Sequence, residues 1–142
     1  MLIRKFAQDD IDSVLKIWLG ASIKSHDFVP AQFWEDKIEM MRKTYLPSSE
    51  TFVCEENDQI LGFYSLVDNN LAAIFVDVEL QGVGIGKKML EDAKDKRLEI
   101  NLSVYKKNKK SLYFYLRNDF KIIQEQMDVN TNEIEILMNW KK

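Results

Sequence analysis

The chain has 142 residues, 46% of them hydrophobic and 30% charged, and we expect residues 1–142 to form a single domain with a sizeable core. Its net charge of −3 argues against a general nucleic-acid binder, which usually carries a basic excess. No apolar run approaches the roughly 20 residues of a membrane span, and residues 1–6 lack the apolar core of a signal peptide. One cysteine excludes an internal disulfide, and a single histidine disfavours zinc. These features predict a cytoplasmic protein with no metal, nucleic-acid or membrane partner.

The first half of the chain predicts one strand, two helices and a hairpin. Apolar residues at helical spacing follow the acidic pair Asp9-Asp10, which suits a helix N-terminus. Pro30 can open a second helix, and Pro47 is expected to stop it. Asn57-Asp58 is a turn signal between two β-prone segments. The expected elements are a strand at 2–6, a helix that includes 11–18, a helix at 30–47, and strands at 51–55 and 60–67.

The second half alternates strands and helices. Residues 71–78 are almost wholly apolar, as expected for a strand covered on both faces, and a glycine-rich segment follows at once. The remaining expected elements are a helix at 87–96, a strand at 98–104, a helix at 108–117, and strands at 120–129 and 134–140. The order β-α-α-β-β-β-α-β-α-β-β predicts an α/β fold with a mixed sheet and helices on both faces. Its central part implies neighbouring parallel strands, and the hairpins imply antiparallel pairing.

Three of the five glycines lie within the six residues 81–86, between a predicted strand and a predicted helix. The N-terminus of a helix carries unpaired N–H groups and a partial positive charge. Glycine lets the backbone approach a ligand closely. We therefore expect an anion site suited to a pyrophosphate, with Lys87 and Lys88 adding charge at its mouth.

Several phosphate-binding patterns compete for this segment. A Walker loop needs glycine at position 81 and Ser or Thr at 88, where the chain has Gln81 and Lys88. The dinucleotide fingerprint needs a third glycine at position 87, which is lysine. The pattern Gln/Arg-x-x-Gly-x-Gly/Ala is filled by Gln81, Gly84 and Gly86. A glycine-rich turn without a ligand is the remaining interpretation, and the order of strand, glycines, lysines and helix argues against it.

Two stretches of this chain resemble the GCN5-related N-acetyltransferase (GNAT) family. Residues 75–86, FVDVELQGVGIG, resemble the motif A of that family. Residues 108–120 carry N-x-x-S-x-x-F-Y-x-x-x-D-F, which resembles a second family motif at the family's separation. The chain departs at Val78, where proline is common, and at Asp119, where glycine is usual. Because Asn118 and Asp119 tolerate a left-handed helix exit, we expect the turn to survive.

The resemblance implies a mostly antiparallel sheet with a central parallel pair of strands that splay apart, and acetyl-CoA as co-substrate without a metal. Backbone N–H groups of the glycine loop would hold the pyrophosphate, and the strand before it would pair with the pantetheine. Asn108 would bind the pantetheine region or serve as a helix cap alone. The residues implied in cofactor binding are Ile74, Phe75, Val76, Gln81, Gly82, Val83, Gly84, Ile85, Gly86, Lys87, Asn108 and Ser111.

By the same resemblance, Tyr115 would protonate the departing CoA thiolate after direct attack by an amine in a ternary complex. Phenol and thiol have similar ordinary pKa values, which suits general acid catalysis. Its alternative role is that of a core aromatic residue. Cys54 is expected to be a small buried hydrophobe rather than a nucleophile. The general base and the acceptor contacts stay open, with four candidates: His26, Trp34, Asp77 and Glu79.

Two clusters have two interpretations each. The basic run 105–110 is either a solvated loop or a contact for the CoA phosphates. Aromatic residues around His26 at positions 28, 33, 34 and 45 suit a core, and we hypothesise that they also line an acceptor pocket.

The expected function is transfer of acetyl from acetyl-CoA to a primary amine of a small molecule or peptide. The alternative is a non-catalytic acyl-CoA-binding module of the same fold. Relatives often form homodimers, which this sequence neither indicates nor excludes. The acceptor cannot be identified from the sequence.

Overall fold

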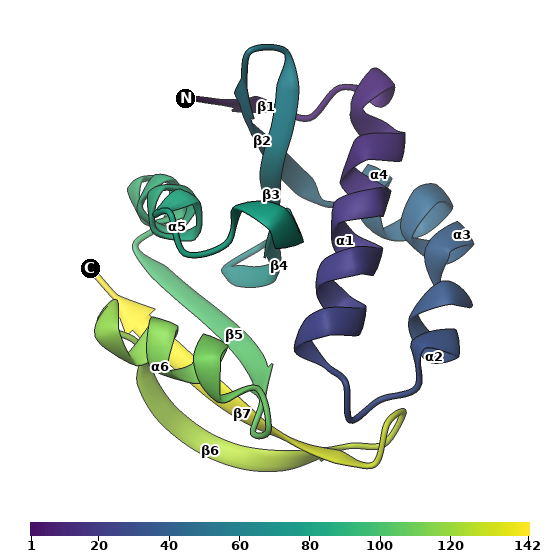
Figure 1. Ribbon diagram of the computed structural model, residues 1–142. Helices are drawn as coiled ribbons and strands as arrows, with labels where there is room; N and C mark the ends of the chain where they lie inside the picture. The colour runs from purple at the N-terminus through teal and green to yellow at the C-terminus, as the bar shows by residue number, and fades with distance from the viewer.

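The computed structural model describes all residues 1–142 and has one seven-stranded sheet in the order β1-β2-β3-β4-β5-β7-β6 (Figure 1). The strands are β1 (Leu2–Lys5), β2 (Glu50–Glu56), β3 (Gln59–Val67), β4 (Asn70–Val76), β5 (Glu99–Tyr105), β6 (Lys121–Asp128) and β7 (Glu133–Lys141). The helices are η1 (Gln8–Asp10), α1 (Ile11–Ser25), α2 (Ala31–Glu35), α3 (Ile38–Met40), η2 (Met41–Tyr45), α4 (Leu46–Ser48), η3 (Val78–Leu80), α5 (Ile85–Asp95) and α6 (Lys109–Arg117). All strand pairs are antiparallel except β4 with β5, so the predicted fold class is confirmed.

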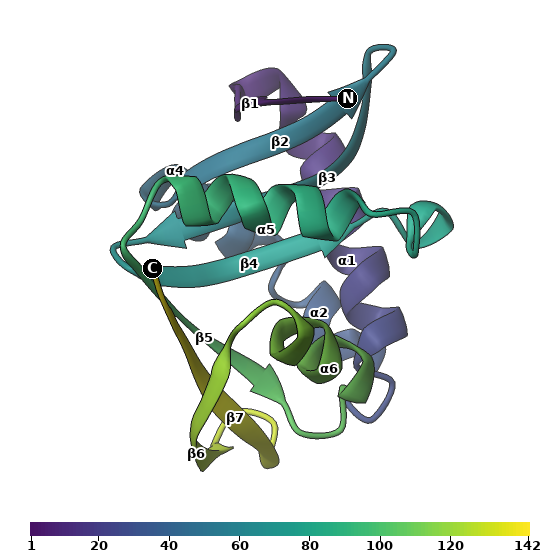
Figure 2. The ribbon, with the colours of Figure 1, turned by 90° about the vertical axis from the view of Figure 1, so that its left-hand side faces the viewer.

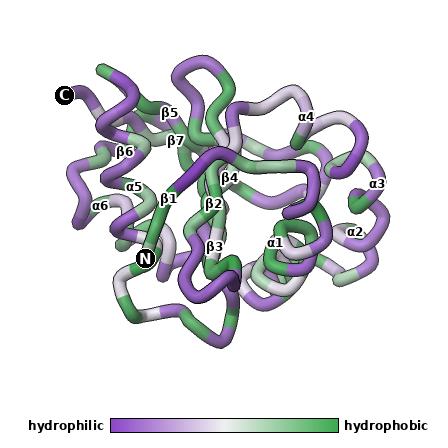
Figure 3. Tube along the Cα trace, turned by 90° about the horizontal axis from the view of Figure 1, so that it is seen from above, coloured by the Kyte–Doolittle hydropathy of each residue, from purple (hydrophilic) through white to green (hydrophobic).

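Helices cover both faces of the sheet and enclose two cores. Helices α1 to α4 lie on one side of β1–β4, whereas α5 and α6 lie on the other side, with α6 against β5 (Figures 1 and 2). Strands β2 and β3 contribute to both cores, because Val53 and Phe63 face α1 whereas Cys54 and Tyr64 face α5. Figure 3 shows hydrophobic segments on the central strands between α1 and α5. No helix is long and apolar enough to span a membrane.

Strands β4 and β5 touch at one end and then separate. Their register has the single pair Asn70 with Asn101, and the Asn101 N–H donates to the carbonyl of Asn69 at 2.8 Å. The strands diverge from there toward their carboxyl ends, where Figure 2 shows α6 beside β5. The predicted parallel pair therefore opens a gap in the middle of the sheet.

A bulge turns the backbone of β4 toward this gap. Against β3, Leu66 pairs with Leu71 and Ser65 with Ala73, which leaves Ala72 without a partner. Beyond the bulge, the Asp77 N–H donates to the Leu61 carbonyl of β3 at 2.9 Å. Hydrogen-bonding groups alternate in direction along a strand, so Ile74 and Val76 direct theirs away from β3 and into the gap. The gap is thus bordered by strand groups without a neighbouring strand.

Three predicted boundaries are wrong. The helix expected over 30–47 is four short segments: Pro30 is the N-cap of α2, and Pro47 lies within the first turn of α4, where no N–H is needed. The strand expected over 71–78 ends at Val76, because the Asp77 carboxylate accepts the Glu79 N–H at 3.0 Å and starts η3. That strand is also not covered on both faces, since residues 73–76 beside the gap are only half-buried. Helix α5 begins two residues earlier than expected, at Ile85.

Candidate functional site

A cavity of about 330 Å³ lies where β4 and β5 separate. Eighteen residues line it: Ser25, His26, Ile74, Phe75, Val76, Leu80, Gln81, Gly82, Gly84, Ile85, Gly86, Lys87, Asn108, Lys110, Ser111, Phe114, Tyr115 and Arg117. They come from the end of α1, the second half of β4, the glycine loop with α5, and α6. All the residues predicted to bind the cofactor, except Val83, therefore line one cavity.

The glycine loop has left-handed glycines and free N–H groups at the start of α5, the geometry that the predicted anion site requires. Gly84 is the N-cap of the helix in a left-handed conformation, and Gly82 shares that conformation; both have φ of 89°. The N–H of Lys88 donates to the Gly84 carbonyl at 3.1 Å, so the N–H groups of residues 85–87 precede the first helical hydrogen bond. These free donors and the helix dipole favour an anion. Val83 projects outward instead, with 66% of its surface exposed, and does not line the cavity.

Helix α6 forms the opposite wall and is anchored by the predicted cap. The Asn108 side-chain oxygen accepts the N–H of Ser111 at 3.3 Å, and Asn108 also lines the cavity. The helix ends at Asp119, whose φ is 72°, so Asp takes the left-handed conformation where the family usually has glycine. The Asn118 amide donates to the Phe114 carbonyl at 2.7 Å and secures this exit. The expected survival of the turn is confirmed.

Tyr115 lies on the cavity side of α6 and is 8% exposed. Its ring packs edge-on against Phe114 and Phe120, with centroids 5.4 and 5.6 Å away. Burial raises the pKa of Tyr115 above its ordinary value, because the phenolate would lose hydration. The phenol is therefore protonated at neutral pH.

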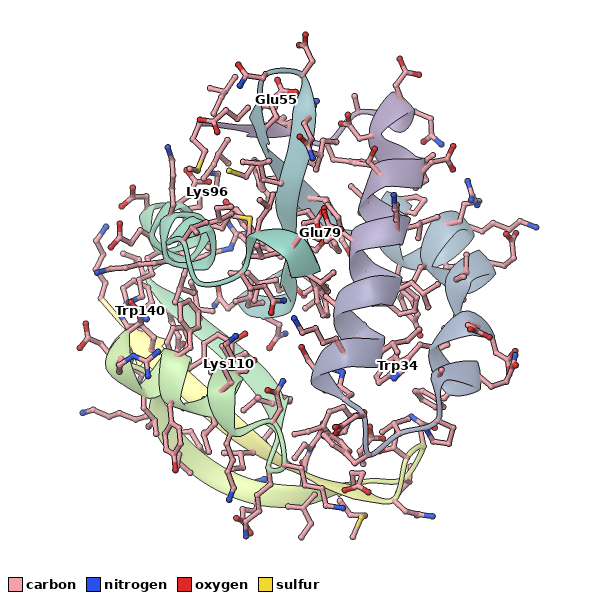
Figure 4. All side chains as sticks on the ribbon, viewed as in Figure 1. Trp34, Glu55, Glu79, Lys96, Lys110 and Trp140 are labelled. Atoms are coloured by element: carbon pink, nitrogen blue, oxygen red, sulfur yellow. The ribbon has the colours of Figure 1, made fainter.

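Three cations and no carboxylate line the cavity, although the chain as a whole is acidic. They are Lys87, Lys110 and Arg117. Figure 4 shows Lys110 on the first turn of α6. Arg117 was missed in the sequence, but it lies seven residues after Lys110 and so shares its helix face. Of the four arginines in the chain, the other three pair with carboxylates, whereas Arg117 has no ion pair.

Other lysines near the motifs point elsewhere. The Lys88 Nζ donates to the carbonyl of Met1 at 2.8 Å, so its predicted place at the mouth of the cradle is wrong. In the basic run, Lys106 pairs with Glu125 at 2.9 Å and Lys107 with Glu133 at 3.0 Å. Of the lysines in that run, only Lys110 lines the cavity.

Three of the four base or acceptor candidates lie outside the cavity. Asp77 caps η3 through the Glu79 N–H, and Glu79 is exposed on the outer side of that turn (Figure 4). Trp34 of α2 is buried in the core that includes α1, with its ring 6.1 Å from that of Trp18. His26 alone of the four lines the cavity. Local capping and core packing thus account for the other three positions.

His26 lies in an aromatic cluster at the end of α1. Its ring centroid is 5.8 Å from that of Phe28 and 5.1 Å from those of Trp34 and Tyr105. Burial lowers the pKa of His26 to about 4, so the imidazole is neutral at pH 7. Tyr45, which the sequence grouped with this cluster, is 49% exposed and lies elsewhere, and Tyr105 of β5 takes its place.

The remaining chemistry-bearing residues do not form a second centre. No group of three His, Cys, Asp or Glu side chains is arranged to hold a metal ion. Cys54 is fully buried in the core under α5, and burial raises the pKa of its thiol. Cys54 is therefore a buried hydrophobe as predicted, since a protonated thiol in a core is a poor nucleophile.

Comparison with known proteins identifies the family. The model of the acetyltransferase (GNAT) domain matches residues 47–122. The peptidyl-lysine N-acetyltransferase YiaC of Escherichia coli is 30% identical over 140 residues, which is 98% of this chain and 96% of the relative. The peptidyl-lysine N-acetyltransferase YjaB of E. coli is 27% identical over 84% of this chain and 82% of its own.

Solved structures share the fold over nearly the whole chain. The solution structure of apo YjaB from E. coli superposes with a TM-score of 0.85 at 24% identity, covering 98% of this chain and 96% of that one. The PaiA N-acetyltransferase of Thermoplasma acidophilum in complex with coenzyme A has a TM-score of 0.81 at 18% identity, covering 99% and 98%. With the two motifs on one cavity and these matches, the chain belongs to the GNAT family and is an acetyl-CoA-dependent N-acetyltransferase.

Proposed function

We propose that this enzyme acetylates the ε-amine of lysine side chains in peptides or proteins. The observation that carries the proposal is the 30% identity to a peptidyl-lysine N-acetyltransferase over 98% of the chain. A second such enzyme is 27% identical over 84% of the chain. The cavity between β4 and β5 supports it, because it presents a proton donor and an anion cradle on a single surface.

We propose one orientation for acetyl-CoA in this cavity. Its pyrophosphate would rest on the free N–H groups of residues 85–87, with Lys87 beside it. The pantetheine would pair with the outward backbone groups of Ile74 and Val76 as an added strand. Asn108 lies on the facing wall. Lys110 and Arg117 would meet the remaining phosphate at the adenosine end.

The reaction we propose is direct attack in a ternary complex. The neutral amine nitrogen forms a bond to the thioester carbon, and the carbon–sulfur bond breaks. The departing thiolate takes the phenolic proton of Tyr115, and the amine proton leaves to water or a base. A backbone N–H at Val76 would stabilise the oxyanion that forms on the carbonyl. The position of Tyr115 on the cavity wall supports this role.

We also propose that residues 1–142 form a single domain that acts in the cytoplasm, with acetyl-CoA and a lysine-bearing protein as its partners rather than nucleic acid or membrane. The two cores share β2 and β3, which supports one domain. The lone buried thiol of Cys54 needs no oxidising compartment. The net charge of −3 argues against nucleic acid.

Release of free thiol from acetyl-CoA tests the acceptor directly. We would supply a peptide with a blocked N-terminus and one lysine, its Lys→Arg counterpart, and a lysine-free peptide with a free α-amine. We expect thiol release and a mass gain of one acetyl group only with the lysine peptide. If the peptide with a free α-amine were acetylated and the lysine peptide were not, the proposal would be wrong and the enzyme would be an N-terminal acetyltransferase.

A further inference from the structure

His26 connects two segments that form different walls of the cofactor cavity. It follows the last residue of α1, whereas Asn108 is the N-cap of α6. The Asn108 Nδ2 and the His26 Nε2 lie 3.3 Å apart, although 82 positions separate the residues in sequence. Both side chains line the cavity. The contact therefore joins the end of α1 to the start of α6, the helix opposite the glycine loop.

The direction of this hydrogen bond follows from the other partner of Asn108. The Asn108 Oδ1 accepts the backbone N–H of Ser111, and a backbone N–H can only donate. The amide oxygen is therefore assigned, and the Nδ2 group faces His26. Because an amide NH₂ also only donates, the His26 Nε2 must accept with its lone pair. The single proton of the neutral ring is then on Nδ1.

The surroundings of the ring favour this neutral form. Aromatic rings of Phe28, Trp34 and Tyr105 pack around the imidazole, and burial lowers its pKa to about 4. The Nδ1 atom is buried and has no hydrogen-bond partner in the protein.

No charged group on the packed elements offsets this burial. The carboxylate of Asp128 accepts the Tyr105 hydroxyl at 2.7 Å, and Lys107 lies over the Phe28 ring at 5.6 Å. The positive charge of Lys37, in the α2–α3 turn, lowers the pKa of Asp128. Asp27, the next residue after His26, is exposed to solvent. A second proton on the imidazole would go to Nε2, where it would face the Asn108 NH₂ group instead of an acceptor. It would therefore break the hydrogen bond from Asn108.

This geometry is unsuitable for a general base. A base needs a free lone pair in reach of the amine. In His26, the Nε2 lone pair is occupied by Asn108, and Nδ1 carries the proton. We propose instead that His26 is a positioning residue: it holds one N–H of the Asn108 amide, so that the second N–H stays directed at bound acetyl-CoA. The direction toward acetyl-CoA rests on the proposed function, whereas the tautomer does not.

The first experiment observes the ring in the wild-type enzyme without substrate. The chain has one histidine, so a long-range ¹H–¹⁵N correlation spectrum shows one set of imidazole signals. We expect the Nδ1–H tautomer and no titration between pH 8 and about 5.5. An Nε2–H tautomer, or a midpoint near the ordinary histidine value, would overturn the proposal. This result is independent of which amine the enzyme acetylates.

The second experiment compares His26→Phe with His26→Gln. Phenylalanine keeps the aromatic packing without an acceptor, whereas glutamine restores an acceptor oxygen. We expect His26→Phe to raise the KM and Kd for acetyl-CoA about threefold to tenfold, as for one lost hydrogen bond, with kcat within about threefold. His26→Gln should recover most of the affinity.

Two other outcomes would overturn the assignment. If His26 were the general base, both variants would lose about 100-fold or more in kcat, and the KM for acetyl-CoA would be unchanged. If His26 had only a structural role, both variants would have lower urea unfolding midpoints and an unchanged Kd for CoA. Urea unfolding of each variant separates lost stability from lost affinity.

Discussion

The Phe114 ring of α6 lies against the backbone of Gly86 in α5. A Cβ on Gly86 would stand 3.6 Å from Phe114 Cζ and 3.7 Å from Val76 Cγ2, which is ordinary van der Waals contact. Gly86 is also helical, so neither space nor φ demands glycine. This explains why the motif accepts alanine at position 86. Gly84 differs, because its φ of 89° is a conformation that favours glycine.

Gly86→Ala and Gly84→Ala form a matched pair of variants. We expect Gly86→Ala to leave the KM for acetyl-CoA within about threefold and to stabilise the fold by about 0.5 kcal/mol, since alanine favours helix. Gly84→Ala forces a Cβ into the left-handed region at a cost of roughly 1–2 kcal/mol and should raise that KM several-fold. Urea unfolding and initial-rate kinetics check both. Equal effects of the two changes would show that the conformation of Gly84 does not determine binding.

Arg117 should distinguish acetyl-CoA from its analogue without the 3′-phosphate. An exposed guanidinium on a phosphate is worth about 1–1.5 kcal/mol, so Arg117→Gln should raise the KM for acetyl-CoA about fivefold to tenfold. The KM for acetyl-dephospho-CoA should change by less than about twofold. Lys121→Gln, which removes a cation outside the cavity, is the control. A loss of the same size with both cofactors would place Arg117 on the pyrophosphate.

Tyr115→Phe should lower kcat and leave the cofactor bound. Loss of a general acid typically costs about 10²–10³ in rate, whereas the ring and its packing stay. The KM for acetyl-CoA should stay within about threefold. Tyr113→Phe on the exposed side of the same helix is the control and should be neutral. Because burial raises the pKa of the Tyr115 phenol, the wild type should show no loss of rate from its ionisation below about pH 10. An active Tyr115→Phe enzyme would exclude the acid role.

The half-buried, neutral imidazole of His26 should make the protein acid-sensitive. The unfolded chain binds a proton at His26 near pH 6.5, but the folded protein resists it down to about pH 4. In this pH window the unfolded state binds more protons than the folded state. The free energy of unfolding is therefore unaffected by His26 protonation above about pH 6.5 and falls as the pH drops below it. Relative to His26→Phe, the wild type should lose about 2 kcal/mol of unfolding free energy between pH 7 and 4.5.

Urea titrations at several pH values test this window. Asp10 and Asp128 also have lowered pKa values, so both proteins lose some stability in acid. Those contributions cancel in the difference between the wild type and His26→Phe. Parallel stability curves for the two proteins would contradict a neutral buried histidine.

Much of the fold could be predicted because its signals are local. Strand alternation, turn residues such as Asn57-Asp58 and the cap at Asn108 act within a few residues, and the structure has each of them. The geometry of the glycine loop was also predictable, since its glycines and the start of α5 are neighbours in the chain. The broken helix over 31–48 was not, because its interruptions at residues 36–37 and 41–45 contain no proline or glycine that would signal a break.

The parts that failed depend on distant contacts. The bulge at Ala72 is set by register against β3, and nothing in the sequence around it marks a bulge. Val83 lies in the motif and Lys88 just after it, but Val83 faces solvent and the Lys88 side chain donates to the carbonyl of Met1. Arg117 could have been found by extending the helical face of Lys110 by two turns.

The single extra residue at Ala72 has a wider consequence. Open strand edges usually lie at the rim of a sheet, where another protein chain can add to them and aggregate. Here the bulge places an unpaired edge at residues 74–76 in the middle of the sheet, inside a cavity of about 330 Å³. A folded neighbour cannot enter such a space, but a thin, extended cofactor arm can. The unpaired backbone groups of residues 74–76 are thus accessible to an extended ligand but not to a strand of another folded protein.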